Sequence, residues 1–327
     1  MFCYSNIAQP DAATDRIRQA TDQWRSIFSA SDESAAELIR QDKIDILVDL
    51  SMHTHGNRLT LFARKPAPVQ ATYLAYSGAT GLEAIDYRFS DRFIDPPDTD
   101  LSLYSEKTIR LPDCYWSYDP GEDVAEVSPL PALQAGFVTF GSLNNLRKVP
   151  APCMDLWIRL IASTPHSRML MLSHEGAYAN DIRQRFARAG VDPARVEFVG
   201  YQPRADYFRT FSRIDICLDP FPYNGGVTTC NSLWMGVPVV TLAGRTSVGR
   251  AGSSILNNVG LPELVAFSPE QYIEIALDLA GDMNRLSDLR LNLRPMMRRS
   301  PLLDLPRHTR NIEAAYQQMW RTWCQRR

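Results

Sequence analysis

Short apolar runs alternate with amphipathic segments along most of the chain. Runs typical of strands lie, among others, at residues 44–50, 137–140, 196–199, 214–218 and 237–242. The segments between them carry apolar side chains at helical spacing. Because the run at 44–50 is largely apolar, it is typical of a strand that is covered on both faces. The alternation of strands and helices predicts an α/β chain built on parallel sheets.

A proline-rich stretch interrupts this alternation. Prolines recur between residues 112 and 131 among acidic residues and without a clear period, which is typical of a linker. A chain of 327 residues also exceeds one comfortable core. We therefore expect two α/β domains and a final helix. Their expected bounds are residues 1–115 for the first domain, 116–135 for the linker, 136–306 for the second domain and 307–327 for a helix that packs back on the body.

The overall charge is close to balanced. The net charge is −2, 22% of the residues are charged, and the arginines are dispersed, so we expect no nucleic-acid partner. The local cluster of Arg294, Arg298 and Arg299 is expected to lie on a solvated helix surface.

Six cysteines form no CxxC pair and show no metal-ligand spacing, which predicts reduced thiols. The N-terminus lacks the basic and apolar regions of a signal peptide, and no apolar run approaches the roughly 18 residues of a membrane span. These features predict a cytoplasmic protein without a membrane partner.

The most informative stretch, Asn224 to Thr229, reads NGGVTT and lies between the runs at 214–218 and 237–242. Two glycines let the backbone approach a ligand, the threonines supply hydroxyl groups, and the N-terminus of the following helix carries a partial positive charge. Such a loop suits a phosphate or diphosphate. An ordinary turn with capping threonines explains the same residues equally well, so the loop alone leaves both interpretations open.

Two further positions follow apolar runs. Lys148, with Asn144 and Asn145 beside it, can neutralise a diphosphate, although most lysines lie on the surface without such a role. His53 follows the strand predicted at 44–50 and is a candidate acid, base or sugar-hydroxyl partner, whereas we expect only a surface role for His55.

Several classes of site are excluded. The Asp and His residues form no ligand set for a metal, and no DxD triplet lies directly before the glycine loop. No GxSxG, Walker or GxGxxG motif is present, which argues against serine hydrolases, P-loop NTPases and standard dinucleotide oxidoreductases. We expect neither a metal nor another cofactor.

Several long blocks, in order, resemble the catalytic region of the O-GlcNAc transferase and SPINDLY family. They include residues 49–91, LPDCYWSYDP at 111–120, GFVTFGSLNNLRKV at 136–149 and residues 217–266. The resemblance implies a GT-B fold, with two Rossmann-like domains facing a cleft. It also implies a metal-independent, inverting transfer of a sugar from a nucleotide donor to Ser or Thr hydroxyls of proteins.

By position, the resemblance assigns roles to individual residues. Lys148 matches the lysine that stabilises the leaving diphosphate, and His53 and Thr54 match the His-Thr pair of the first domain. The residues that match donor-binding positions are Asn145, Gln202, Arg204, Tyr207, Gly226, Val227, Thr228, Thr229, Asn231 and Arg250. Among these, Gln202 and Arg204 match positions that hold the base and ribose, and Gly226 to Thr228 match the triplet that binds the diphosphate.

The sequence departs from the family pattern in three ways. Tyr207 stands where many members have a histidine near the base, and its ring can still stack on a base. Asn231 stands where an acidic residue usually holds the ribose, and an amide can accept the same hydrogen bond. The family's first strand, its histidine loop and its tetratricopeptide repeats are expected to precede Met1, so we expect an incomplete N-terminal domain.

These observations predict a protein O-glycosyltransferase with UDP-GlcNAc as the preferred donor and Ser or Thr of proteins as the acceptor. Two alternatives stay open. One is a protein O-fucosyltransferase that uses GDP-fucose, since the segments around FPY and TTC also suit the SPINDLY branch. The other is a catalytically silent module that binds a nucleotide sugar.

Overall fold

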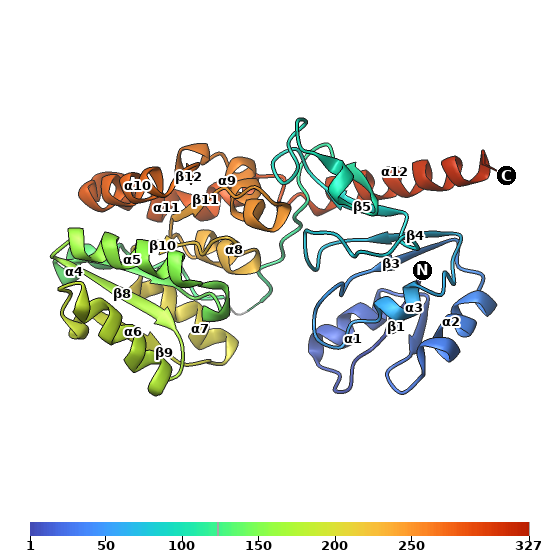
Figure 1. Ribbon diagram of the computed structural model, residues 1–327, viewed down its shortest axis with the longest axis horizontal. Coiled ribbons are helices and arrows are strands. Elements are labelled where there is room, and N and C mark those ends of the chain that lie inside the picture. Colours follow the sequence, from blue (N-terminus) through green and yellow to red (C-terminus); the bar gives the residue numbers. More distant parts are fainter. Residues whose placement is uncertain (123, 327) are drawn as a thin grey trace. The chain divides into compact units, whose positions relative to one another are not determined.

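The computed structural model describes residues 1–122 and 124–326, and its chain divides into two compact units (Figure 1). The first unit consists of residues 1–89, 100–109 and 313–327, and the second of residues 90–99 and 110–312. Each unit has its own parallel β-structure and its own hydrophobic core.

The first unit contains a strand pair and a four-stranded sheet. Its elements are β1 (Phe2–Ser5), α1 (Ala12–Gln19), β2 (Gln23–Ser26), α2 (Asp32–Gln41), β3 (Ile46–Asp49), α3 (Leu59–Phe62), β4 (Val69–Thr72), β5 (Tyr87–Ser90) and β6 (Lys107–Arg110). Strands β1 and β2 pair in parallel, and the larger sheet has the order β3-β4-β5-β6. Its core brings Ala35 and Ile39 of α2 together with Leu47 and Phe62.

The second unit is built on a six-stranded parallel sheet with the order β12-β11-β10-β7-β8-β9. Its elements are α4 (Pro131–Ala135), β7 (Val138–Ser142), α5 (Ala151–Ser163), β8 (Ser167–Leu172), α6 (Ala177–Arg188), β9 (Val196–Val199), α7 (Arg204–Thr210), β10 (Ile216–Leu218), α8 (Val227–Trp234), β11 (Val239–Leu242), α9 (Ala251–Val259), β12 (Val265–Ala266), α10 (Pro269–Gly281) and α11 (Met283–Arg299).

The strand order of this sheet reverses between β7 and β10. Strands β8 and β9 follow on one side of β7, and β10, β11 and β12 lie on its other side. Where the order reverses, the connections leave the carboxyl ends of adjacent strands in opposite directions and open a space for a ligand. The topology therefore places the second unit's most favourable ligand site next to the ends of β7 and β10.

The strands predicted in the sequence at 44–50, 137–140, 196–199, 214–218 and 237–242 are confirmed as β3, β7, β9, β10 and β11. One element was predicted wrongly. The helical spacing of Ile17, Ala20 and Trp24 predicts a first helix at about 11–24. In the structure α1 ends at Gln19, and Trp24 lies in β2, opposite Cys3 of β1. An apolar side chain at position 24 fits a helix and a strand equally well. The pairing of this segment with β1 makes it a strand.

The stretch at 116–135, expected as a linker, belongs to the second unit. The Tyr118 amide donates to the Leu302 carbonyl at 2.9 Å, and the Ala132 amide donates to Asp215 Oδ1 at 2.8 Å. Because described residues of this stretch find hydrogen-bond partners in the second unit, they are folded despite the prolines and the lack of period. Residues 90–99, expected in the first domain, also belong to the second unit.

The predicted C-terminal helix is present as α12 (Leu305–Cys324), and its residues from 313 on belong to the first unit. There Tyr316 packs edge-on against Phe89 of β5, with ring centroids 5.8 Å apart. The helix begins two residues before the predicted bound of 307.

Two arginines of α11 are buried, which corrects the expectation of a solvated surface for Arg294. Arg290 is 1% exposed and donates to the carbonyls of Ile214 at 2.8 Å and Phe211 at 3.1 Å. Arg294 is 7% exposed and donates to the carbonyls of Trp234 at 2.8 Å and Ala125 at 2.7 Å. These guanidinium groups satisfy carbonyls where helices and loops end, which explains why charged groups lie in the core. Arg298 and Arg299 are exposed, as expected.

We expect Arg290→Met to destabilise the second unit strongly, because the buried carbonyls of Ile214 and Phe211 would lose the guanidinium that donates to them. Unsatisfied buried groups cost about 1–3 kcal/mol each, so the melting temperature should fall by roughly 5–10 °C. Differential scanning calorimetry measures this change. The exposed Arg299→Met on the same helix is the matched control and should leave the melting temperature within about 1 °C. Equal effects of the two substitutions would contradict the assigned role of Arg290.

Candidate functional site

The loops after β7 and β10 meet at the carboxyl edge of the second sheet. The two strands pair in parallel, with Ile216 opposite Phe140 and Cys217 opposite Gly141. Strand β7 therefore delivers residues 143–148, and β10 delivers residues 219–226, to the same place. The Lys148 ammonium donates to the Asn224 carbonyl at 3.1 Å. The segments around Lys148 and Asn224, which the sequence singled out separately, therefore lie together within this unit.

Helix α8 begins directly after the two glycines. Its N-cap is Gly226, which has no side chain to accept from the first backbone amides. Val227 is 65% exposed and Thr228 is half-buried, so the first turn faces outward, whereas Thr229 is buried. Uncapped amides at a helix N-terminus attract an anion through their hydrogen atoms and through the helix dipole. The helix start is thus chemically suited to the diphosphate that the sequence predicted.

Both glycines are required by close packing. A Cβ atom on Gly226 would lie 2.7 Å from the ring of Trp116. A Cβ atom on Gly225 would lie 2.7 Å from Thr229 Oγ1 and 3.0 Å from Asn144 Oδ1. Any larger residue would displace the loop, so the glycines set the position of the helix start.

Lys148 lies on a 3-10 turn, Leu146–Lys148, and its ammonium also lies 3.9 Å from the ring centroid of Tyr223. Burial lowers the pKa of Lys148, and the nearby Asp219 carboxylate opposes this effect. The ammonium therefore makes one carbonyl bond and one cation–π contact, and can still donate to an oxyanion.

A buried carboxylate lies under the glycine loop. Asp219 directly follows β10 and is 1% exposed. Its Oδ1 accepts from the Gly225 amide at 2.7 Å, and its Oδ2 accepts from the Thr241 hydroxyl at 2.6 Å. Burial raises the pKa of Asp219 to about 7, while these hydrogen bonds and the Lys148 charge act in the opposite direction. Asp215, at the other end of β10, does not converge with it.

Asn144 and Asn145 have different positions. Asn144 is buried, and its Oδ1 has no hydrogen-bond partner among the described residues. Asn145, the residue singled out by the family resemblance, is exposed and accepts from the Arg147 amide at 3.0 Å as the cap of the turn. The asparagine that lies beside Gly225 is therefore Asn144.

Asn231 of α8 lies between two tyrosines. The Tyr118 hydroxyl donates to Asn231 Oδ1 at 2.7 Å, and Asn231 Nδ2 donates to the Tyr207 hydroxyl at 3.2 Å. Burial raises the pKa of Tyr207 to about 12, so its hydroxyl keeps its proton and can donate it to another group. The amide that was expected to hold a ribose thus also fixes both tyrosine rings.

Gln202 and Arg204 lie near the start of α7 and are exposed. Gln202 Oε1 accepts from the Thr210 hydroxyl at 2.8 Å. The Arg204 guanidinium donates to the Pro120 carbonyl and lies 4.9 Å from the Phe208 ring centroid. Both side chains are accessible to a ligand on this surface.

Arg250 lies half-buried just before α9. It donates to the Phe93 carbonyl at 2.9 Å and to the Gly244 carbonyl at 3.2 Å. Burial lowers its pKa, whereas nearby aspartates oppose this effect. These bonds connect Arg250 to loops of its own unit. The neighbouring Gly249 packs against the glycine loop, because its Cβ atom would lie 2.8 Å from the Pro222 carbonyl oxygen.

In the first unit, the loops after β3 and β4 also meet. His53 Nε2 lies 2.8 Å from the Ala79 carbonyl oxygen, and its ring packs edge-on against Tyr76 with centroids 5.7 Å apart. The Thr54 hydroxyl donates to the Ser51 carbonyl at 2.6 Å. His55 is exposed, as expected. His53 thus has a fixed orientation at the carboxyl edge of the first unit's larger sheet.

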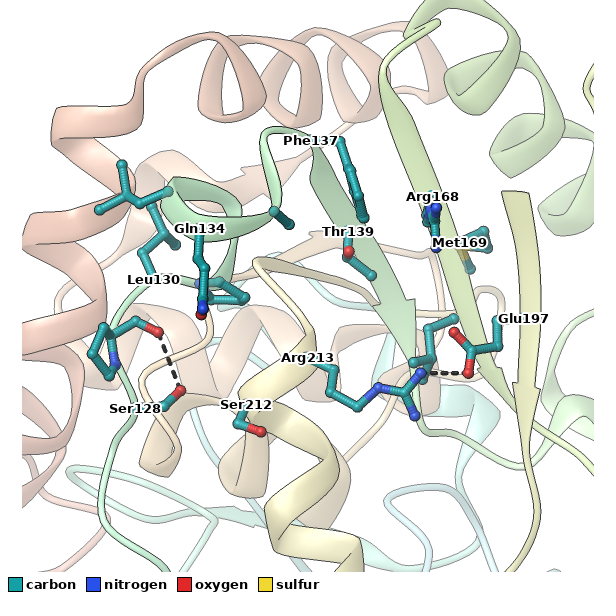
Figure 2. A pocket seen from close by; sticks show the side chains of 15 residues that line it. Ser128, Leu130, Gln134, Phe137, Thr139, Arg168, Met169, Glu197, Ser212 and Arg213 are labelled. Atoms are coloured by element: carbon teal, nitrogen blue, oxygen red, sulfur yellow. Dashed lines mark hydrogen bonds and ion pairs between the residues drawn. The ribbon is translucent and has the colours of Figure 1, made fainter. Parts of the chain in front are cut away.

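The second unit also has a concavity of about 740 Å³, shown in Figure 2, which is lined in part by Phe137, Thr139, Arg168 and Glu197. These residues lie at or near the amino ends of β7, β8 and β9. None of the candidate donor-binding residues lines it. Ligands of parallel α/β sheets bind at the opposite, carboxyl edge, so we assign the candidate site to that edge despite the size of this concavity.

The described residues contain no group of three or more His, Cys, Asp or Glu side chains arranged to hold a metal ion. Within the same residues, no helix is both long enough and apolar enough to cross a bilayer.

Sequence reasoning missed three residues at this site. Trp116 and Tyr118 lie in the stretch that was interpreted as a linker, and the role of Asp219 beneath the loop was not foreseen. The Trp116 indole Nε1 is buried and has no hydrogen-bond partner among the residues the structure describes. The aromatic residues of LPDCYWSYDP, unusual for a linker, were the available signal.

Comparison with known proteins gives a consistent result. The family model described as Glycosyl transferase family 41 matches residues 1–126 and 130–312. The chain is 41% identical to the probable UDP-N-acetylglucosamine–peptide N-acetylglucosaminyltransferase SPINDLY of Petunia hybrida, over 98% of this chain and 35% of that protein. It is 30% identical to the probable UDP-N-acetylglucosamine–peptide N-acetylglucosaminyltransferase SEC of Arabidopsis thaliana, over 99% of this chain and 34% of that protein. The chain thus spans about a third of the length of these curated relatives.

A solved structure agrees closely. A mutant O-GlcNAc transferase of Thermobaculum terrenum superposes with a TM-score of 0.94 at 40% identity, covering 99% of this chain and 62% of that chain. The two Rossmann-like units therefore have the GT-B glycosyltransferase fold. Since the family model covers almost the whole sequence, the chain belongs to glycosyltransferase family 41.

Proposed function

We propose that this chain is the catalytic region of a protein O-glycosyltransferase that transfers GlcNAc from UDP-GlcNAc to Ser or Thr hydroxyls of proteins. The observation that carries the proposal is the meeting of Lys148 with the Asn224 carbonyl beside the uncapped start of α8. An ammonium group and backbone amides at one place provide the positive charge that a leaving diphosphate requires. The relatives named above support the choice of sugar and acceptor.

In the proposed reaction, the acceptor hydroxyl gives its proton to a base, a role considered for His53 below. Its oxygen forms a bond to the anomeric carbon while the bond from that carbon to the diphosphate breaks, with inversion. Negative charge then develops on the diphosphate oxygens. Lys148 and the amides of Gly226 to Thr228 stabilise that charge without a metal ion. Gln202, Arg204, Tyr207 and Asn231 are the proposed contacts for the base and ribose, and Asn145, Thr229, Arg250 and Thr54 complete the proposed donor contacts.

We assign a proton-transfer or sugar-contacting role to His53. A carbonyl oxygen can only accept a hydrogen bond, so Nε2, which lies 2.8 Å from the Ala79 carbonyl, carries the ring proton in neutral His53. Its Nδ1 lone pair is then available to accept a proton, or a hydrogen bond from a hydroxyl group.

GDP-fucose is the second candidate donor. The identity of 41% with a SPINDLY protein exceeds the 30% with SEC, although both relatives are named as N-acetylglucosaminyltransferases. The link of the SPINDLY branch to GDP-fucose rests on the resemblance of the segments around FPY and TTC. A third candidate, a binding module without catalysis, shares the same diphosphate contacts and differs only in the absence of sugar transfer.

We expect Lys148→Ala to reduce donor turnover by about 100-fold or more, because developing charge on the leaving group would lose its ammonium partner. Release of nucleoside diphosphate from the sugar nucleotide measures this without a known acceptor protein. The matched control is Arg147→Ala, which removes an exposed cation from the same turn and should retain most of the turnover. Unchanged turnover in Lys148→Ala would refute the leaving-group role, and absence of turnover in the unmodified chain would favour the binding module.

We expect UDP to bind more tightly than GDP, and UDP-GlcNAc more tightly than GDP-fucose, since our preferred donor carries uracil. Isothermal titration calorimetry with all four ligands measures the difference directly. Tighter binding of GDP and GDP-fucose would overturn the preference and support the fucosyltransferase candidate. Failure of every ligand to bind would overturn the proposed function itself.

A further inference from the structure

We propose that Asp219 is a positioning residue of the donor site: its buried carboxylate holds the loop 219–225 in the conformation that presents the start of α8 to the diphosphate. This inference rests on the proposed function. Asp219 itself does not touch the donor in this proposal. It acts through Gly225, which precedes the helix start.

Every polar group of Asp219 is used to hold the loop. Its carboxylate joins the Gly225 amide to the Thr241 hydroxyl of β11, at 2.7 and 2.6 Å. Its own amide donates to the Val240 carbonyl at 3.0 Å, and its carbonyl accepts from the Tyr272 hydroxyl at 3.0 Å. The carboxylate thus connects the far end of the loop to two central strands of the sheet.

The other side of the loop is held through Asn224. Its carbonyl accepts from Lys148 at 3.1 Å, its amide donates to the Val248 carbonyl at 3.2 Å, and its side chain donates to the Pro220 carbonyl at 2.8 Å. The Asn224 carbonyl and the Gly225 amide belong to one peptide group, so Lys148 and Asp219 hold its two opposite sides. A shift of Asp219 would therefore also change where the Lys148 ammonium lies.

The side chain of Asp219 is tightly packed between two glycines. A Cβ atom on Gly225 would lie 2.9 Å from Oδ1, and one on Gly252 of α9 would lie 2.4 Å from Oδ2. Two glycines from different elements therefore allow the backbone to close around this side chain. Such packing exceeds what a simple turn requires and points to a defined loop geometry.

The charged and titratable groups that face Asp219 come from several elements. They are Lys148 on the turn after β7, Cys153 of α5, Cys217 of β10 and Tyr272 of α10. Burial raises the pKa values of both cysteines and the tyrosine, so these groups are neutral near pH 7. Lys148 is therefore the facing cation, and the carboxylate counteracts the lowering of its pKa by burial.

Asp215 provides a matched control on the same strand. It is fully buried and lies just before β10, where its carboxylate accepts from the amides of Ala132 and Thr139, both at 2.8 Å. Burial raises its pKa as well. Asp215 resembles Asp219 in burial, hydrogen bonding and strand, but lies at the edge of the sheet remote from the donor loop.

Titration calorimetry of the whole chain with UDP-GlcNAc, or with GDP-fucose if that ligand binds better, tests the proposal. We expect Asp219→Ala to weaken donor binding by about tenfold or more, because the Gly225 amide loses its acceptor. Asp219→Asn keeps an acceptor oxygen and should stay within about threefold of the unmodified chain near pH 7. Asp215→Asn should stay within about twofold. The fitted stoichiometry reports the folded fraction, so lower stability is separated from weaker binding.

The proposal is overturned if folded Asp219→Ala binds the donor as tightly as the unmodified chain, or if Asp215→Asn weakens binding equally. If Asp219→Ala does not fold, Thr241→Val decides. It removes one hydrogen bond from the carboxylate, so a loss of about three- to fivefold supports the proposal and unchanged binding overturns it. Should the unmodified chain bind no sugar nucleotide, the proposed function fails, and a role in positioning the donor fails with it.

A pH profile separates this role from a merely structural one. Loss of the carboxylate charge in Asp219→Asn should lower the Lys148 pKa further, because burial then acts unopposed. Donor affinity should therefore begin to fall at a lower pH than in the unmodified chain when measured between about pH 6.5 and 9. The titration of the ligand is common to all variants and cancels in the comparison. Superimposable profiles for Asp219→Asn and the unmodified chain would contradict the charge coupling.

Discussion

The candidate site depends on the path of the loop from β10 to α8, and the carboxylate of Asp219 holds that loop. The chain leaves β10 at the centre of a parallel sheet and must enter α8 with its first amides unoccupied. Asp219 accepts from the Gly225 amide from beneath, at 2.7 Å, while the first amides of α8 have no side-chain cap. The outer face of the helix start is consequently left for an anion.

The cation beside this loop follows from strand order rather than from nearness in sequence. Lys148 and Asn224 are 76 positions apart, yet they touch because β7 and β10 are neighbours at the point where the sheet order reverses. The tyrosines that bond Asn231 also come from distant parts of the sequence. Tyr118 precedes the sheet but reaches Asn231 of α8, so three distant segments form one surface. The fold thus brings together a helix start suited to a diphosphate, a cation and aromatic rings.

Sequence patterns were sufficient for the elements with strong periodicity. The strands at 44–50 and 214–218 and the glycine loop at 224–229 follow from local chemistry, because apolar runs and glycines have few alternative structures. Trp24 was assigned to a helix wrongly, because only its pairing with another strand distinguishes a strand from a helix at this position. Arg294 was misassigned because burial of a guanidinium depends on carbonyl partners that no local pattern reveals. The role of Asp219 likewise depends on a contact with a residue of another strand, Thr241.

The indole of Trp116 packs so closely on Gly226 that no Cβ atom fits between them, and its buried N–H has no partner among the described residues. Because indole emission depends on the local electric field, an anion on the adjacent amides would change the emission of Trp116, one of six tryptophans in the chain. This change would report occupancy of the helix start without a label and without knowledge of the acceptor.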